Sequence, residues 1–108
     1  MTVKISPSIL AADLLHLGAQ VAAAEQGGAD RFQVDVMDGV FVPNISFGQP
    51  LVAAMRRATK LLLEAHLMIV QPERYVEGFA RAGADLIITY FAREAARLLE
   101  RQRFASSL

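Results

Sequence analysis

Segments with a strand pattern alternate with segments with a helix pattern four times along this 108-residue chain, and only short links join them. Apolar residues recur at every second position in the first kind of segment and at every third or fourth position in the second. We expect strands at 3–10, 31–37, 60–70 and 86–90, and helices at about 13–25, 50–58, 72–82 and 92–104. This alternation is typical of parallel strands joined by right-handed crossovers, with the helices outside the sheet.

The predicted helices carry start and stop signals. Asp13 can cap the first helix and Gly27-Gly28 can end it, while Pro50 and Pro72 suit the first turns of the second and third helices. The predicted buried stripes consist of apolar residues three or four positions apart, namely Leu14, Leu17, Val21 and Ala24 in the first helix and Tyr75, Val76, Phe79 and Ala80 in the third.

The repeated units favour a barrel, because no glycine-rich dinucleotide-binding turn follows the first predicted strand. A complete (β/α)₈ barrel needs eight units and about 250 residues. We therefore expect an α/β fold in which residues 1–108 form a single incomplete barrel domain, the (βα)₄ half of a TIM barrel.

Composition bounds the function. Eleven basic and eleven acidic residues balance, which gives no electrostatic reason to expect nucleic acid or an anionic membrane as partner. The chain has no cysteine, and no signal segment or membrane span is recognisable, so a soluble cytoplasmic protein is expected. Its hydrophobic content of 54% is high for a small domain, and two strand edges would stay unpaired. We therefore expect a homo-oligomer.

Two predicted strands place side chains with chemical capability on defined faces. Successive residues of a strand face opposite ways, so Asp35 and Met37 share one face, and His66 and Met68 share another. In a parallel barrel these residues and Ser8 would surround the mouth at the C-terminal strand ends, where barrel enzymes hold their active sites. From spacing alone, Asp35 could equally anchor a loop and His66 could be a hydrogen-bonded core histidine.

Four motifs occur in order along the chain. They are SPSILAAD at 6–13, DVMDGVFVPN at 35–44, HLM at 66–68 and FARAGAD at 79–85. With them the chain resembles the N-terminal half of ribulose-phosphate 3-epimerase, a TIM-barrel isomerase of the pentose phosphate and Calvin pathways. The resemblance runs from about residue 3 to residue 85, and the sequence diverges from Tyr90 onward.

The resemblance implies an activity: conversion of D-ribulose 5-phosphate to D-xylulose 5-phosphate by metal-assisted proton transfer through an enediolate. It implies that Asp35 is both a catalytic acid/base group and a metal ligand, and that His66 is a metal ligand close to the substrate. It further implies that Ser8 binds the sugar phosphate and that Met37 and Met68 form a wall around the reacting carbons. The implied cofactor is a divalent cation: Zn²⁺, Mn²⁺, Fe²⁺ or Co²⁺.

The chain also departs from the family pattern. Gln33 stands at a metal-binding histidine position, and an amide oxygen suits harder ions such as Mg²⁺ or Mn²⁺ better than Zn²⁺. Tyr90 follows Thr89 where the family has a histidine. The second catalytic aspartate and the glycine-rich phosphate loops belong to the other half of the barrel. We therefore expect this chain alone to be inactive or nearly so.

Two alternatives remain open from the sequence. The chain could be a non-catalytic, self-associating half-barrel, or a truncated gene product. A related decarboxylase or hexulose-phosphate synthase is disfavoured, because those enzymes share an Asp-Xaa-Lys strand motif and Met37 stands at the lysine position. The arginines of the predicted last helix alternate with glutamates, which is typical of a solvated amphipathic helix and carries no functional claim.

Overall fold

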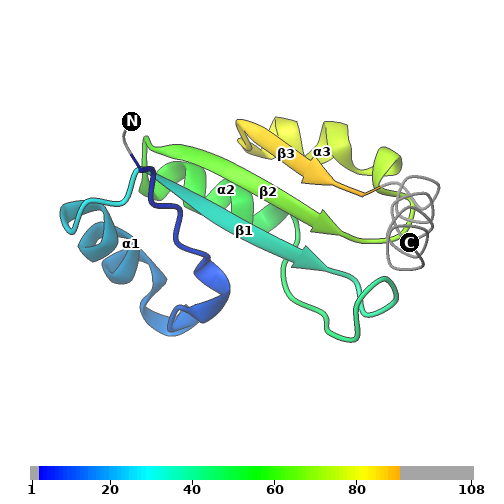
Figure 1. Cartoon of the computed structure of the whole chain (residues 1–108), viewed down its shortest axis with the longest axis horizontal. Coiled ribbons are helices and arrows are strands. Elements are labelled where there is room, and N and C mark those ends of the chain that lie inside the picture. Colours follow the sequence, from blue (N-terminus) through cyan, green and yellow to red (C-terminus); the bar gives the residue numbers. More distant parts are fainter. Residues whose placement is uncertain (1–2, 91–108) are drawn as a thin grey trace, which may run out of the picture.

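A computed structural model describes residues 3–90 of the chain, and these form a parallel α/β unit (Figure 1). The sheet has three strands in the order β1-β2-β3, with both neighbouring pairs parallel. The elements are α1 (Leu17–Gln26), β1 (Arg31–Met37), α2 (Gln49–Ala58), β2 (Leu62–Met68), α3 (Val76–Ala82) and β3 (Leu86–Thr89), with short 3₁₀ helices η1 (Ile9–Ala11), η2 (Leu14–His16) and η3 (Pro72–Arg74). Within this part of the chain no helix is long and apolar enough to span a bilayer.

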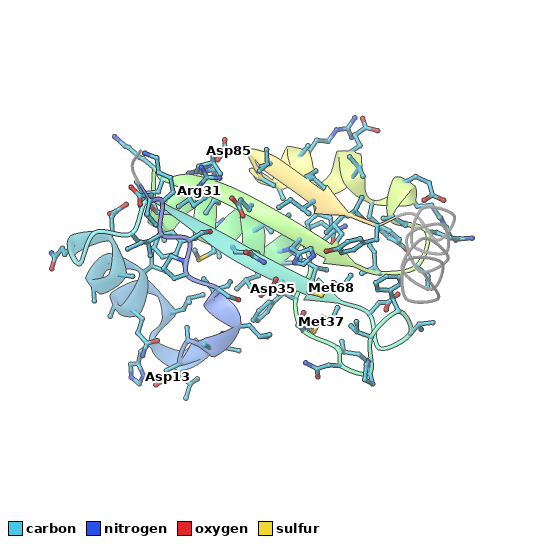
Figure 2. The ribbon with its side chains drawn as sticks, viewed as in Figure 1. Asp13, Arg31, Asp35, Met37, Met68 and Asp85 are labelled. Atoms are coloured by element: carbon cyan, nitrogen blue, oxygen red, sulfur yellow. The ribbon has the colours of Figure 1, made fainter. Side chains whose placement is uncertain are left out.

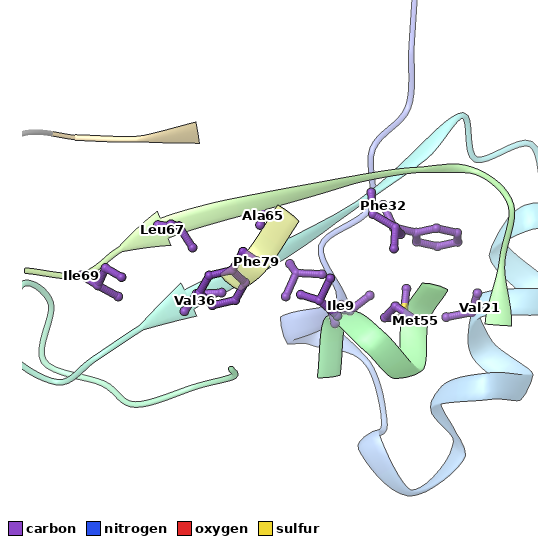
Figure 3. Close-up of a cluster of buried hydrophobic side chains, with 12 residues drawn as sticks. Ile9, Val21, Phe32, Val36, Met55, Ala65, Leu67, Ile69 and Phe79 are labelled. Carbon is purple, nitrogen blue, oxygen red and sulfur yellow. The ribbon is translucent and has the colours of Figure 1, made fainter. Parts of the chain in front are cut away.

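Helices α2 and α3 cover one face of the sheet, and in Figure 1 both lie behind the strands. The buried core lies between this face and the helices (Figure 3), and Phe32, Leu63, Met55 and Phe79 are among its largest side chains. We call the opposite face, which α2 and α3 do not cover, the inner face. Because successive side chains of a strand face opposite ways, the apolar side chains of the strands pack against the helices, and the residues between them lie on the inner face.

The predicted first strand is wrong as a strand. The segment runs beside β1, where Gln33 N–H donates to the Pro7 carbonyl at 2.9 Å, but only one parallel bridge forms, between Ser8 and Gln33. Pro7 has no N–H to continue a ladder. Ser8 then caps η1 by accepting a hydrogen bond from Leu10 N–H, which turns the chain out of the extended direction.

The other predicted strands agree closely with the structure. The prediction for 31–37 matches β1, β2 lies within 60–70, and β3 covers all but the last residue of 86–90. Asp85 fixes the start of β3, because its carboxylate accepts hydrogen bonds from Leu63 N–H at 2.9 Å and from Arg56 at 2.7 Å. The predicted helix at 92–104 lies outside the described residues.

The first and third helices differ from the prediction in their starts and their buried sides. Asp13 caps the short η2, and the α-helix begins only at Leu17, so Leu14 falls out of phase with the buried stripe and is 55% exposed. In the same way η3 precedes α3, and both Tyr75 and Ala80 are exposed although both were predicted to be buried. Asp13 and Pro72 each begin a short 3₁₀ helix before the α-helix, and this changes the angular position of the residues beside it.

The core predicts a clear contrast in stability. Met55→Ala should lower the free energy of unfolding by about 2–5 kcal/mol, because the side chain is fully buried between α2 and the sheet. Leu15→Ala, at a residue that is 91% exposed, should change it by less than about 0.5 kcal/mol. Urea unfolding followed by circular dichroism measures both, and equal losses in the two variants would contradict the described core.

Candidate active site

The inner face carries its side chains in layers that follow the register of β1 and β2. Gln33 pairs with Glu64, Asp35 with His66 and Met37 with Met68, in order toward the C-terminal ends of the strands. Figure 2 shows Asp35, Met37 and Met68 together at this end, with Arg31 toward the other. The register thus brings together the predicted site residues of both strands.

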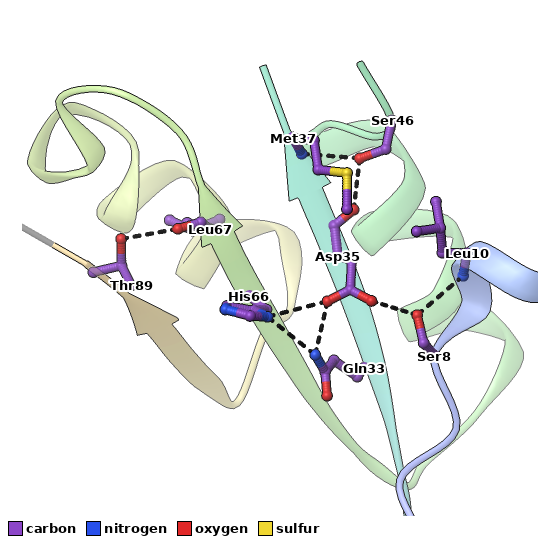
Figure 4. A network of polar contacts seen from close by, with 9 residues as sticks. All are labelled: Ser8, Leu10, Gln33, Asp35, Met37, Ser46, His66, Leu67 and Thr89. Carbon is purple, nitrogen blue, oxygen red and sulfur yellow. Dashed lines mark hydrogen bonds and ion pairs between the residues drawn. The ribbon is translucent and has the colours of Figure 1, made fainter. Parts of the chain in front are cut away.

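Asp35 is the centre of a polar cluster that joins three segments of the chain (Figure 4). One carboxylate oxygen, Oδ2, accepts a hydrogen bond from the Ser8 hydroxyl at 2.5 Å. The other, Oδ1, accepts one from the Gln33 amide nitrogen at 2.7 Å and lies 3.1 Å from His66 Nδ1. The cluster therefore includes four of the residues that the sequence singled out.

These contacts decide the charge of Asp35. Burial raises the pKa of its carboxyl group, but the hydrogen bonds from Ser8, Gln33 and His66, together with the electrostatic interaction with His66, lower the pKa by more. The pKa of Asp35 therefore lies below its ordinary value, and the group is ionised near neutral pH. An ionised carboxylate can accept a proton, although a low pKa makes it a weak base.

His66 presents its two ring nitrogens to different surroundings. Nδ1 faces the cluster, whereas Nε2 is buried and has no hydrogen-bond partner among residues 3–90. The ring lies against Tyr90, at 5.7 Å between centroids, and Tyr90 stacks on Phe41 at 6.3 Å. A buried polar atom without a partner is uncommon in folded proteins and is typical of a site that takes a ligand.

The loop after β1 is held by two residues that sequence reasoning did not assign to the site. Ser46 donates a hydrogen bond to the Asp35 carbonyl at 2.6 Å and accepts one from Met37 N–H at 2.9 Å. Asp38 accepts hydrogen bonds from Val40 and Phe41 within the loop and from Val70 N–H beyond β2, at 2.8 Å. The DVMDG motif contains Asp38, but no local pattern marks Ser46, because its partner is a backbone carbonyl eleven residues away.

The Asp38 carboxylate responds to these contacts as well. The hydrogen bond from Val70 N–H, followed by those from Val40 and Phe41, lowers the pKa of Asp38 by more than burial raises it. The carboxylate thus ties the loops that follow β1 and β2, and both loops lie at the C-terminal edge of the sheet.

The methionines and a partly buried ion pair lie on either side of the cluster. Met37 and Met68 are half-buried beyond it, and the Asn44 amide donates a weak hydrogen bond to the Met37 sulfur at 3.6 Å. On the other side, Arg31 and buried Glu64 form an ion pair at 2.6 Å. Since Arg31 already pairs with Glu64, Asp35 is the carboxylate that accepts the hydrogen bonds of the polar cluster.

The cluster offers a partial set of metal ligands. No group of three or more His, Cys, Asp or Glu side chains that could hold a metal occurs in residues 3–90. Asp35 and His66 supply two ligand types, and the Gln33 amide lies within hydrogen-bond distance of both. The Gln33 oxygen is the third candidate ligand, so the residues fit a divalent cation through one carboxylate, one imidazole and one amide.

A parallel βα sheet with ionisable side chains at its C-terminal strand ends, on the face away from the helices, is the arrangement of (β/α)₈-barrel enzymes. Sequence comparison names the family within that class. The profile of the ribulose-phosphate 3 epimerase family matches residues 4–103, and the chain belongs to this family. The match extends beyond residue 85, where the four motifs end.

Curated relatives support this assignment. The chain is similar to ribulose-phosphate 3-epimerase of Synechocystis sp., with 50% identity over 92% of the chain and 43% of the relative. It is 52% identical to the Bacillus subtilis enzyme of that name, over 79% of the chain and 39% of the relative. A chloroplastic ribulose-5-phosphate-3-epimerase of Arabidopsis thaliana is 48% identical over 90% of the chain and 34% of its own length. The chain therefore spans less than half the length of these relatives.

The ionised Asp35 predicts how stability depends on pH. A carboxyl group whose pKa is lowered by folding contributes stability above its unfolded pKa, about 3.9, and that contribution disappears as the pH falls through the folded value. Asp35→Asn should cost about 1–3 kcal/mol at neutral pH, because it removes the negative charge and one of the two oxygens that accept hydrogen bonds from Ser8 and Gln33.

The same variant should show a shallower loss of stability than the wild type between pH 5 and pH 2, measured by urea unfolding. Both proteins should still lose some stability as the pH falls, because the pKa values of Asp38 and Asp85 are also lowered by folding. Identical pH profiles for wild type and variant would show that Asp35 is not held as described.

Proposed function

We propose that this chain carries the proton-abstracting, cation-binding half of a ribulose-phosphate 3-epimerase site and acts on a sugar phosphate such as D-ribulose 5-phosphate. The observation that carries the proposal is the ionised Asp35 beside His66 on the inner face, in a chain of this family. Removal of a proton next to a ketone needs such a base within reach of the carbon.

The family is generally metal-dependent, and Asp35, His66 and Gln33 are the residues that would hold the cation here. When bound, a Zn²⁺, Mn²⁺, Fe²⁺ or Co²⁺ ion would stabilise the negative charge that develops on the substrate oxygen.

The cytoplasmic location stays a prediction, and the relatives include both a cytoplasmic rice isoform and the chloroplastic protein.

The remaining residues have supporting roles in this proposal. The Ser8 hydroxyl donates a hydrogen bond to Asp35 and accepts one from Leu10 N–H. These contacts support a role in orienting the base, in addition to the predicted contact with the sugar phosphate. Met37 and Met68 would exclude water from the reacting carbons, because their half-buried thioethers adjoin the cluster at the strand ends.

Inversion of a carbon centre needs a second acid on the opposite side of the substrate. In residues 3–90, the inner-face carboxylates of β1 and β2 are Asp35 and Glu64, and Arg31 holds Glu64. The described residues therefore support proton removal from one side without delivery to the other. We propose that this chain alone epimerises its substrate only at trace rates.

A second proposal, self-association, rests on exposed apolar side chains of the inner face. In the described residues β3 pairs with β2 alone, and Leu86, Ile88 and Tyr90 are 41%, 38% and 42% exposed. A second copy of the chain could cover this surface and pair with the edge of β3. Such a homo-oligomer would hold two copies of the Asp35 cluster.

Proton removal predicts isotope exchange without epimerisation. Solvent deuterium should enter the carbon beside the ketone of ribulose 5-phosphate, while a coupled assay should detect no more than a trace of xylulose 5-phosphate. Asp35→Asn should slow this exchange on the order of 10²-fold or more, because it removes the base. Asp13→Asn, which changes an exposed helix cap, should leave the rate unchanged. NMR of the substrate carbon measures the exchange, and equal rates in the Asp35 variant and the wild type would contradict the role of Asp35.

Self-association predicts a mass above that of one chain in light scattering after size exclusion. Ile88→Lys should shift the protein toward the monomer, because it places a charge on the exposed apolar surface. Leu15→Lys adds the same charge at a residue of η2 that is 91% exposed, and should leave the mass unchanged. A wild-type mass equal to one chain at micromolar concentration would refute this second proposal.

A further inference from the structure

Three polar atoms of the site face one another across the neighbouring strands β1 and β2 (Figure 4). The Gln33 amide nitrogen lies 2.7 Å from Asp35 Oδ1 and 3.1 Å from His66 Nδ1. The third distance, from His66 Nδ1 to Asp35 Oδ1, is 3.1 Å. The three atoms therefore form a nearly equilateral triangle with one amide, one carboxylate and one imidazole corner.

These distances suit a shared cation. Two ligands that each lie about 2.1 Å from one ion, at right angles to each other, are about 3 Å apart. All three sides of the triangle are close to that value. The carboxylate is also held in one orientation by Ser8 on its other oxygen, which resembles the outer hydrogen bonds that orient metal ligands.

The Gln33 amide has two ways to face this triangle. Without a cation its nitrogen faces inward and donates a hydrogen bond to Asp35 Oδ1 at 2.7 Å. Nitrogen and oxygen of a primary amide exchange places by rotation about the last side-chain bond, with almost no change of shape. Without a cation, an inward-facing oxygen would lie against the Asp35 carboxylate, and two hydrogen-bond acceptors would repel each other. With a cation between them, the oxygen can face inward.

We propose that Gln33 determines the cation selectivity of this site by turning its amide oxygen inward when a divalent ion binds. The inference rests on the function proposed above and adds a role for a residue that touches both Asp35 and His66. Amide and carboxylate oxygens suit Mn²⁺ and Mg²⁺, whereas imidazole nitrogens suit Zn²⁺. With Gln33 in place, the site discriminates less in favour of Zn²⁺ over Mn²⁺ than it would with an imidazole at that position.

The turn of the amide also limits affinity. The Gln33 hydrogen bond to Asp35 is lost when the oxygen turns inward. The hydrogen bond between His66 Nδ1 and Asp35 is lost as well, because a nitrogen that binds a cation carries no proton, so the ring proton must then be on Nε2. Each binding event therefore replaces existing interactions. An imidazole at position 33 could present a nitrogen lone pair to the triangle in place of the amide donor. Replacing Gln33 by histidine therefore strengthens Zn²⁺ binding more than Mn²⁺ binding.

The test measures metal binding by the full chain in the absence of sugar phosphate, so that its failure is separate from a failure of the proposed activity. Electron paramagnetic resonance of free Mn²⁺ gives the Mn²⁺ dissociation constant, and competition by Zn²⁺ gives the second constant. Gln33→His should raise the ratio of Zn²⁺ to Mn²⁺ affinity by about tenfold or more. Gln33→Leu should weaken Mn²⁺ binding by a similar factor, because it removes the amide ligand.

Matched controls separate this site from adventitious binding. Gln26→His adds an imidazole at an exposed position near the end of α1 and should leave the affinity ratio unchanged. Asp35→Asn should abolish Mn²⁺ binding. If Gln33→Leu does not fold, as judged by circular dichroism, Gln33→His and the wild type still decide the question. The proposal is overturned if the wild type binds no Mn²⁺ at millimolar concentration, or if Gln33→His leaves the ratio unchanged.

Discussion

The hydrogen bonds to the Asp35 carboxylate join the N-terminal segment to the two paired strands β1 and β2. Ser8 belongs to the N-terminal segment, Gln33 to β1 and His66 to β2, and each donates to or faces this one side chain. The N-terminal segment makes one parallel bridge to the sheet, at Ser8, and its Ile5 and Pro7 carbonyls accept backbone hydrogen bonds from Arg31 and Gln33. The Asp35 carboxylate therefore adds a side-chain link between this segment and the sheet, where a regular first strand would add backbone hydrogen bonds. This link lies within the candidate active site.

The division of the sheet into two faces puts this cluster on the face that α2 and α3 leave uncovered. The apolar residues of β1 and β2 pack on α2 and α3, and the alternate residues face the other way as an ion pair, a polar cluster and a pair of methionines. A shift of register by one residue would place Asp35 and His66 among the helices and their apolar partners on the inner face. The core that stabilises the fold thus also fixes the orientation of the site.

Much of this arrangement could be predicted from the sequence, because periodicity is a local property. The strand at 31–37 was predicted correctly, and so was the gathering of Ser8, Asp35 and His66 toward the C-terminal strand ends. Asp13 does cap a helix, but that helix is the short η2 and not α1. The family resemblance also proved correct. The first strand was wrong because Pro7 and Ser8 favour a turn there, a preference that the apolar pattern does not reveal.

Other features depend on partners distant in the sequence and could not be read from a local pattern. The exposure of Tyr75 follows from the short 3₁₀ turn that precedes α3, and the role of Ser46 follows from a contact with the backbone of β1. Tyr90 looked like a departure from the family, yet its ring packs on His66. The amide orientation of Gln33 depends on the charge of Asp35, which only the complete cluster of hydrogen bonds determines.

A double-mutant cycle tests whether the Asp35 carboxylate links the N-terminal segment to the sheet through Ser8. The free energy of unfolding is measured in urea at neutral pH for Ser8→Ala, Asp35→Asn, the double variant and the wild type. A direct hydrogen bond predicts a coupling energy of about 0.5–3 kcal/mol between the two substitutions. Additive effects, within about 0.3–0.5 kcal/mol, would show that the two side chains act independently and would contradict the account.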